Sequence, residues 1–149
     1  MSKEFISNCV EETKNFAGRF AKKLKPGDIL ALYGGLGAGK TAFIQGLAAG
    51  LGYKSRVFSP TFIFVRPYKI SDQESEISNQ KVKTLYHIDL YRLEKPTDLA
   101  TIGISEFLRE PGTASAIEWP EKIEKQLPPK TIKIQIAVVD ENTRHFFIR

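Results

Sequence analysis

Residues 28–41 of this 149-residue chain read DILALYGGLGAGKT, an apolar segment followed at once by a glycine-rich one. The apolar part, 28–33, is short and bounded by turn residues, which is typical of a strand buried on both faces of a sheet. The glycine-rich part, 34–41, fits the pattern G-x-x-x-x-G-K-[ST] in full. Apolar spacing predicts a helix over 40–51, and Gly52 is placed to end it. Strand, glycine loop and helix in this order are the decisive feature of the sequence.

A glycine loop between a strand and a helix is suited to binding phosphate. Glycines admit the unusual φ angles that turn backbone N–H groups inward, and the helix N-terminus adds free amides and a favourable dipole. Lys40 supplies a point charge for the β- and γ-phosphates, and the hydroxyl of Thr41 is suited to ligating Mg²⁺. The expected nucleotide-binding residues are Gly34, Gly35, Leu36, Gly37, Ala38, Gly39, Lys40 and Thr41.

The expected nucleotide is ATP. Guanine-specific P-loop proteins usually carry an Asn-Lys-x-Asp run and an Asp-x-x-Gly switch, and neither pattern occurs in the chain. The triphosphate and Mg²⁺ are therefore the expected cofactors.

Two carboxylates end other short apolar segments. Asp89 ends the expected strand 82–89, and Glu118 ends the expected strand 114–118. The carboxyl ends of parallel strands meet at one edge of an α/β sheet, so both side chains are expected near the glycine loop. A P-loop enzyme needs an acid there for Mg²⁺ or for the attacking water. The pattern alone leaves these two roles undivided between the two residues.

The segment 59–61, Ser-Pro-Thr, lies just before another expected strand, 62–68. In P-loop enzymes a hydroxyl from such a segment senses the γ-phosphate and completes the Mg²⁺ shell. An ordinary Ser-Pro turn accounts for the same residues equally well, so local sequence leaves both interpretations open.

The rest of the chain predicts an α/β fold. Apolar spacing predicts an amphipathic helix over 9–24, and strict alternation predicts a strand over 131–138 that forms a hairpin with 144–149. Residues 71–81 are almost entirely polar and predict an exposed loop. The expected architecture is a single P-loop NTPase domain over 1–149, with a central, mostly parallel sheet flanked by helices and a C-terminal antiparallel hairpin.

Composition agrees with an ordinary globular protein. Charged residues make up 26% and hydrophobic residues 42% of the chain, which excludes a disordered or fibrous class. Cys9 is the only cysteine, so no internal disulfide forms, and the two histidines argue against a structural zinc site. No apolar run reaches the roughly 18–20 residues of a membrane span, and the first residues lack the apolar region of a secretory signal. We expect a cytoplasmic protein without membrane contact.

Four segments in register resemble the TsaE (YjeE) family of small bacterial P-loop ATPases. They are 32–41 (LYGGLGAGKT), 59–62 (SPTF), 87–93 (HIDLYRL) and 117–120 (IEWP). The resemblance spans nearly the whole chain, from the first helix to the terminal hairpin. A glycine loop alone would be weak support for a family, whereas four motifs in order are strong support.

The resemblance implies roles for individual residues. Thr41 and Glu118 are similar to the family's Mg²⁺ ligands, and Asp89 is similar to an acid of the nucleotide site that orients the attacking water. Thr61 resembles a switch-like threonine, and Arg144 resembles a basic residue near the nucleotide. The catalytic residues implied in this way are Lys40, Asp89 and Thr61.

The resemblance also implies the function of an accessory, Mg²⁺-dependent ATPase. Such a protein binds and hydrolyses ATP to support turnover of a TsaB–TsaD complex that makes threonylcarbamoyladenosine in tRNA. The tRNA is contacted only indirectly or within that complex. One departure is Gly35, which stands where the family usually has Asp. Glycine at this position leaves the phosphate loop intact, but it removes a carboxylate suited to adjusting Mg²⁺ binding or to orienting the attacking water.

Two other functions stay open at this point. A small-molecule kinase shares the phosphate loop but needs an arginine-rich lid to exclude water, and residues 71–81 contain no arginine. A non-catalytic docking protein, gated by ATP, would bind nucleotide without turning it over, and Gly35 is compatible with that role.

Overall fold

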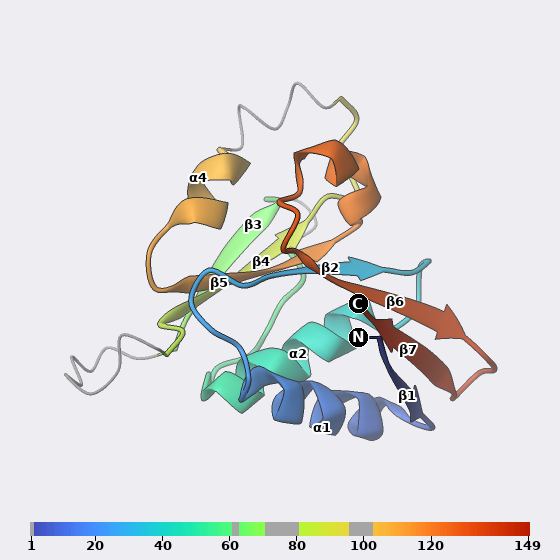
Figure 1. The fold of residues 1–149 in the computed structure, drawn as a ribbon. Coiled ribbons are helices and arrows are strands. Elements are labelled where there is room, and N and C mark those ends of the chain that lie inside the picture. Colours follow the sequence, from blue (N-terminus) through green and yellow to red (C-terminus); the bar gives the residue numbers. More distant parts are fainter. Residues whose placement is uncertain (1, 61–62, 71–80, 96–102) are drawn as a thin grey trace.

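The computed structural model describes residues 2–60, 63–70, 81–95 and 103–149, and its central feature is a seven-stranded sheet (Figure 1). The strands lie in the order β1-β7-β6-β2-β5-β4-β3. The strand bounds are β1 Lys3–Ser7, β2 Ile29–Tyr33, β3 Val65–Lys69, β4 Thr84–Asp89, β5 Thr113–Glu118, β6 Ile132–Val138 and β7 Arg144–Ile148. The helices are α1 Val10–Ala21, α2 Lys40–Leu51, α4 Ile104–Arg109 and the 3₁₀ segment η1 Pro120–Gln126.

The centre of the sheet is parallel, and both of its edges are antiparallel. Strands β6, β2, β5 and β4 pair in parallel, and the predicted hairpin of β6 with β7 is confirmed. The expectation of a mostly parallel sheet was wrong at the other edge, where β3 pairs antiparallel with β4. A parallel neighbour needs a crossover, usually a helix. The polar sequence 71–80, between β3 and β4, has no apolar face on which such a helix could pack. The loop expected over 71–81 lies outside the described residues except for its last residue.

An edge strand, β1, was missed by the sequence analysis. It pairs antiparallel with β7, with Phe5 opposite Phe146. Its burial alternates weakly, since Ser7 is its only buried residue. Five residues with so little apolar alternation do not stand out in a sequence, and their pairing depends on the C-terminal hairpin being in place.

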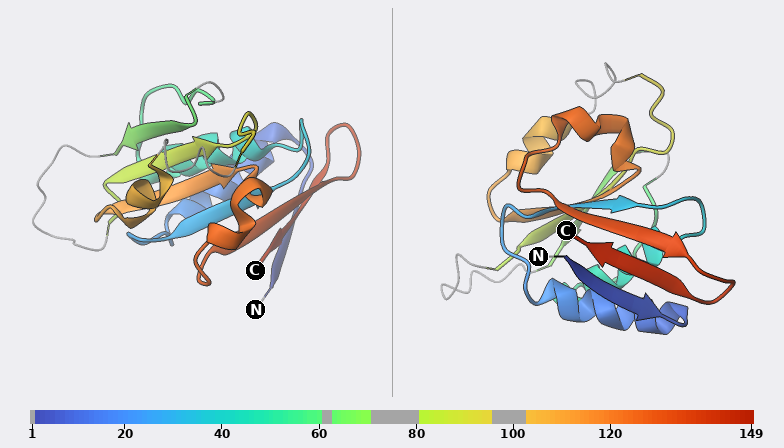
Figure 2. Two further views of the ribbon diagram at one scale, coloured as in Figure 1. Left: turned by 90° about the horizontal axis from the view of Figure 1, so that it is seen from above. Right: turned by 45° about the vertical axis from the view of Figure 1, so that its right-hand side comes forward.

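Alternation along the central strands produces two separate cores, one on each face of the sheet. One face of the sheet packs against α1 and α2, and its buried residues include Leu30, Leu32 and Leu85. Residues next to these in the sequence, such as Ile29 and Tyr86, point to the opposite face and pack against α4 and η1. Figure 2 shows the two pairs of helices on opposite sides of the sheet. The same alternation decides which strand residues point toward the glycine loop, because α2 begins at that loop.

Helices α1 and α2 approach each other closely because glycines lie between them. A Cβ at Gly46 would come within 2.4 Å of the backbone oxygen of Lys14, and one at Gly50 within 2.6 Å of Gly18.

Helices α1 and α2 have 12 residues each. In the part of the chain that the structure describes, no helix combines the length and apolar character needed to cross a membrane.

Gly46→Ala is expected to lower the free energy of unfolding by about 1–3 kcal/mol, because the added methyl group must push the two helix backbones apart. Urea unfolding of the purified chain measures this change. Gly18→Ala is the matched control on the facing helix, since its Cβ would lie 3.6 Å from the nearest atom, the backbone oxygen of Gly46. Equal stability of Gly46→Ala and the unmodified chain would contradict the close approach.

Candidate functional site

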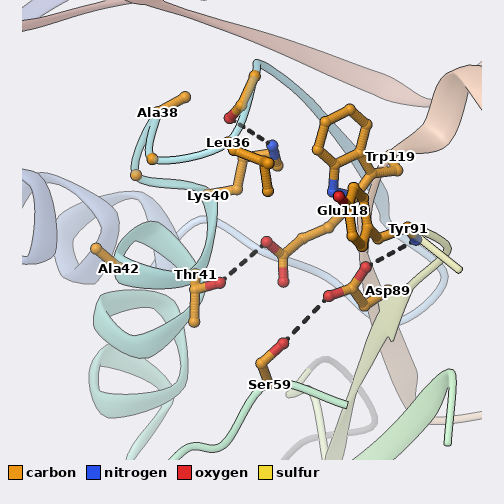
Figure 3. Close-up of a pocket in the computed structure, with 13 residues that line it drawn as sticks. Leu36, Ala38, Lys40, Thr41, Ala42, Ser59, Asp89, Tyr91, Glu118 and Trp119 are labelled. Carbon is orange, nitrogen blue, oxygen red and sulfur yellow. Dashed lines mark hydrogen bonds between the residues drawn. The ribbon is translucent and has the colours of Figure 1, made fainter. Parts of the chain in front are cut away.

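The glycine loop, residues 34–39, connects the end of β2 to the start of α2. Gly37 and Gly39 have φ angles of 76° and 102°, in the left-handed region that favours glycine. Gly39 is also the N-cap of α2, so the chain enters the helix directly from this conformation. The first-turn amides of a helix have no partner within the helix, and here they open toward a cleft of about 390 Å³. Figure 3 shows the residues that line this cleft.

Lys40 folds back over the loop that precedes it. Its Nζ donates to the backbone oxygens of Gly34 and Gly35, and lies 4.1 Å from the centroid of the Trp119 ring. The residue is only 5% exposed. Burial lowers the pKa of Lys40 below its ordinary 10.5, while the negative charge of Glu118 acts in the opposite direction. The cleft therefore contains a cation held by uncharged partners, an arrangement that suits an incoming anion.

The two predicted carboxylates lie side by side at the ends of neighbouring parallel strands. Asp89 ends β4 and Glu118 ends β5, and the two residues are opposite each other in the register. The hydroxyl of Thr41 donates to Oε1 of Glu118 at 3.0 Å. Asp89 instead accepts from the hydroxyl of Ser59 at 3.1 Å and from the backbone N–H of Tyr91 at 2.9 Å. The geometry thus separates two carboxylates that sequence could not distinguish.

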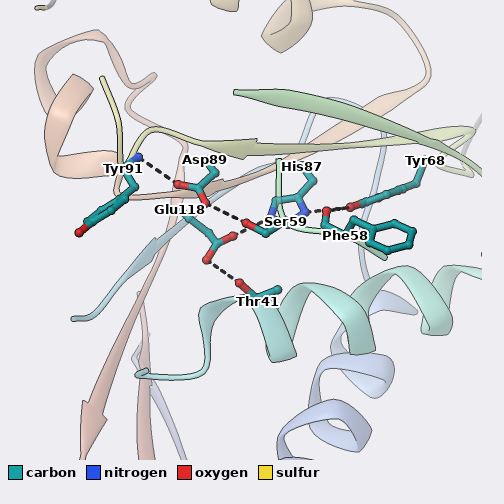
Figure 4. A network of polar contacts seen from close by, with 8 residues as sticks. All are labelled: Thr41, Phe58, Ser59, Tyr68, His87, Asp89, Tyr91 and Glu118. Carbon is teal, nitrogen blue, oxygen red and sulfur yellow. Dashed lines mark hydrogen bonds and ion pairs between the residues drawn. The ribbon is translucent and has the colours of Figure 1, made fainter. Parts of the chain in front are cut away.

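Two buried side chains behind Glu118 were missed by the sequence analysis. Nε2 of His87 lies 2.6 Å from Oε2 of Glu118, and Nδ1 of His87 lies 3.0 Å from the hydroxyl of Tyr68 (Figure 4). His87 is two residues before Asp89 on β4, so the pleat places both side chains on the same face. That spacing was the available signal, whereas the contribution of Tyr68 depends on the pairing of β3 with β4.

The remaining predicted residues lie in different positions. The guanidinium of Arg144 donates to backbone oxygens of the β6–β7 turn and, at 3.1 Å, to the backbone oxygen of Gly37. It therefore holds the outer side of the glycine loop. Thr61 lies outside the described residues. Ser59, two residues before it, lines the cleft.

The residues present fit Mg²⁺ bound together with phosphates. Thr41, Asp89 and Glu118 offer hydroxyl and carboxylate oxygens, the hard donors that Mg²⁺ prefers. Within the described ranges, no group of three or more His, Cys, Asp or Glu side chains could hold a metal by itself. Mg²⁺ commonly uses one or two carboxylates and completes its shell with waters and substrate phosphates. The donor set matches that mode of binding.

Comparisons with known proteins agree with one family. A family model described as threonylcarbamoyl adenosine biosynthesis protein TsaE matches residues 7–146. The TsaE proteins of Rickettsia felis and Bacillus subtilis, named for tRNA threonylcarbamoyladenosine biosynthesis, are each 40% identical over 140 and 134 residues. These matches cover 93% and 90% of this chain, and 75% and 77% of the two relatives. The crystal structure of Bacillus subtilis YdiB matches with a TM-score of 0.77 at 33% identity, covering 99% of this chain and 84% of that one.

Glu118→Gln is expected to lower the pKa of Lys40 further, because the substitution removes a negative charge that raises this pKa against the effect of burial. NMR of the reductively ¹³C-methylated chain follows the titration of Lys40 directly. Glu141→Gln is the control, since Glu141 is not among the carboxylates that act on Lys40. A rise in the pKa of Lys40 in Glu118→Gln would contradict the placement of the two residues.

Proposed function

The chain belongs to the TsaE family, and from this premise we propose that it is an accessory ATPase of tRNA threonylcarbamoyladenosine biosynthesis. It binds and hydrolyses ATP and thereby supports turnover of a TsaB–TsaD complex. The tRNA is contacted only indirectly or within that complex. Because ATP and tRNA are cytoplasmic, the proposal implies a cytoplasmic protein.

The observation that carries the proposal is the contact of Thr41 with Glu118 beside Lys40, in the cleft formed by the glycine loop. The loop amides bind the phosphate oxygens, and Lys40 exchanges backbone oxygens for the β- and γ-phosphates. Thr41 and Glu118 hold Mg²⁺, which neutralises negative charge on the phosphates when it is bound. The parallel strands, glycine loop and helix support the P-loop NTPase fold as part of the same proposal.

Asp89 is assigned to the attacking water. Its carboxylate lines the cleft and is oriented by Ser59 and Tyr91, and a carboxylate oxygen there is a suitable acceptor for a hydrogen bond from a water beside the phosphates. Thr61 is assigned a catalytic role because it lies in the segment 59–62 (SPTF) that resembles the family. Arg144 supports nucleotide binding in this proposal by holding the loop at Gly37.

A second candidate function is an ATP-gated docking protein without hydrolysis, and one observation favours keeping it. A Cβ at Gly35 would meet no atom within 4 Å, so the loop has room for the aspartate that the resemblance leads us to expect there. The chain thus lacks a carboxylate that its loop would accommodate. Binding of ATP without turnover is the property that distinguishes the two functions.

ATP turnover by the purified chain, alone and with a TsaB–TsaD pair and tRNA, tests the proposal. We expect slow turnover alone and faster turnover with the complex present. Nucleotide binding without turnover under both conditions would favour the docking protein. Transfer of phosphate to a small acceptor in place of hydrolysis would favour a kinase.

Lys40→Ala is expected to weaken ATP binding about 10- to 150-fold, because the phosphates lose a charge-assisted contact worth about 1.5–3 kcal/mol. Isothermal titration calorimetry with ATP and Mg²⁺ measures the loss. Lys22→Ala is the control, since Lys22 is an exposed residue at the C-terminal end of α1. Unchanged affinity in Lys40→Ala would contradict the phosphate-loop interpretation.

Glu118→Ala is expected to weaken the Mg²⁺ dependence of turnover while ATP still binds, because the metal loses its carboxylate and the loop is retained. Turnover is measured across a Mg²⁺ titration, with Glu141→Ala as a control on the exposed β6–β7 turn. If the Mg²⁺ dependence of Glu118→Ala equals that of the unmodified chain, the metal role passes to Asp89.

A further inference from the structure

A continuous series of hydrogen bonds passes through the protein interior from the backbone oxygen of Phe58 to the hydroxyl of Thr41 (Figure 4). Its three inner members are Tyr68, His87 and Glu118, which are 1%, 0% and 3% exposed. Only Thr41 and Glu118 belong to the predicted nucleotide site. His87 and Tyr68 have no part in the function proposed above. His87 nevertheless contacts the carboxylate of Glu118 directly, and Tyr68 reaches it through His87.

The sheet itself sets this series. Strands β3, β4 and β5 are adjacent, with Tyr68 opposite Leu85 and Asp89 opposite Glu118. Side chains two residues apart on a strand share a face, so His87 lies on the same face as both of these opposed pairs. The three side chains therefore follow a diagonal across three strands, beneath the start of α2.

The chemistry of the groups fixes the direction of the two hydrogen bonds made by Tyr68. A backbone oxygen only accepts, so Tyr68 gives its single hydroxyl proton to Phe58 at 2.7 Å. The oxygen of Tyr68 must then accept from Nδ1–H of His87 at 3.0 Å. Burial raises the pKa of Tyr68 to about 12, which keeps the phenol protonated. These directions leave Nε2 of His87 facing Oε2 of Glu118 at 2.6 Å.

This arrangement holds Glu118 at both oxygens. Oε2 meets His87 at 2.6 Å, and Oε1 accepts from Thr41 at 3.0 Å. If a bound metal took the place of the Thr41 contact, the His87 contact would remain to orient the carboxylate. Partners behind a metal ligand fix its geometry in this way, and their loss typically weakens metal binding or activity about 10- to 100-fold.

The same series reaches the segment that precedes Thr61. Tyr68 binds the backbone oxygen of Phe58, and the next residue, Ser59, donates to Asp89 at 3.1 Å. Two adjacent residues are therefore attached separately to the two carboxylates of the cleft. A displacement of this dipeptide would act on both carboxylates together.

We propose that His87 and Tyr68 are positioning residues that orient Glu118 for the metal and couple it to the dipeptide Phe58-Ser59. The inference rests on the proposed function only where it refers to the metal and the nucleotide. The hydrogen-bond series and its directions stand on the geometry of the chain alone.

Tyr68→Phe tests the role in metal binding. ATP affinity is measured by calorimetry with Mg²⁺ and again with EDTA. We expect an affinity close to that of the unmodified chain in EDTA and a loss of about tenfold or more with Mg²⁺. A loss equal in both conditions, or no loss in either, would overturn the positioning role. A purely structural effect would weaken both measurements alike.

Tyr86→Phe is the matched control. Tyr86 lies on β4 next to His87, is 8% exposed, and donates its hydroxyl to Glu110 on the opposite face of the sheet. Its removal deletes a comparable hydrogen bond without touching Glu118. We expect its Mg²⁺-dependent affinity to equal that of the unmodified chain, and an equal loss in Tyr68→Phe and Tyr86→Phe would overturn the proposal.

Nitrogen NMR of the imidazole rings tests the series independently of any nucleotide. The chain has two histidines, so a His145→Gln variant assigns the signals of His87. We expect a proton on Nδ1 of His87 that is bonded to Tyr68, and a changed Nδ1 signal in Tyr68→Phe. An unprotonated Nδ1 would overturn the inferred directions. Absence of ATP binding in the unmodified chain would contradict the proposed function instead, and this measurement would still decide the hydrogen-bond series.

Discussion

The parallel pairing of β2, β5 and β4 is the constraint on which the site depends. It brings the carboxyl ends of three strands to one edge of the sheet, where β2 continues into the glycine loop, β5 ends in Glu118 and β4 ends in Asp89. The left-handed glycines then turn the chain into α2, so that the hydroxyl of Thr41 lies against Glu118 (Figure 3). Segments about 80 residues apart in the chain converge because strand order, rather than sequence proximity, sets their positions.

Among the described residues, Lys40, Asp89 and Glu118 are more than nine-tenths buried at this edge, and each has a specific partner. Lys40 has the backbone oxygens of its loop and the Trp119 ring, and Glu118 has Thr41 and His87. Asp89 has Ser59 and the Tyr91 amide. Burial without partners would cost several kcal/mol for each charge, so these contacts offset the cost of placing the charges at this edge.

The sequence predicted those parts of this arrangement that depend on local pattern. The segment DILALYGGLGAGKT was sufficient for β2 and the loop, and the apolar spacing of 40–51 was sufficient for α2. Strand-end position was sufficient to bring Asp89 and Glu118 to the site. Contacts across strands were out of reach. The difference between the two carboxylates lies in which hydroxyl each one meets, and the roles of His87 and Tyr68 follow from the diagonal register of β3, β4 and β5. Strand β1 and the antiparallel direction of β3 also depend on neighbours that a local pattern does not reveal.

Phe58 joins the buried hydrogen-bond series to the surface of the protein. The backbone oxygen of Phe58 accepts from buried Tyr68, while the residue is 49% exposed. The centroid of its ring lies 5.1 Å and 5.7 Å from the guanidinium carbons of Arg56 and Arg66. One residue thus has its backbone in the hydrogen-bond series and its side chain at the surface. In the proposed coupling of Glu118 to the dipeptide Phe58-Ser59, the backbone that carries this ring is the end of the series opposite to the cleft. Under the proposed function hydrolysis serves a partner, and the series through His87 and Tyr68 is the path of hydrogen bonds that joins the cleft to this exposed residue.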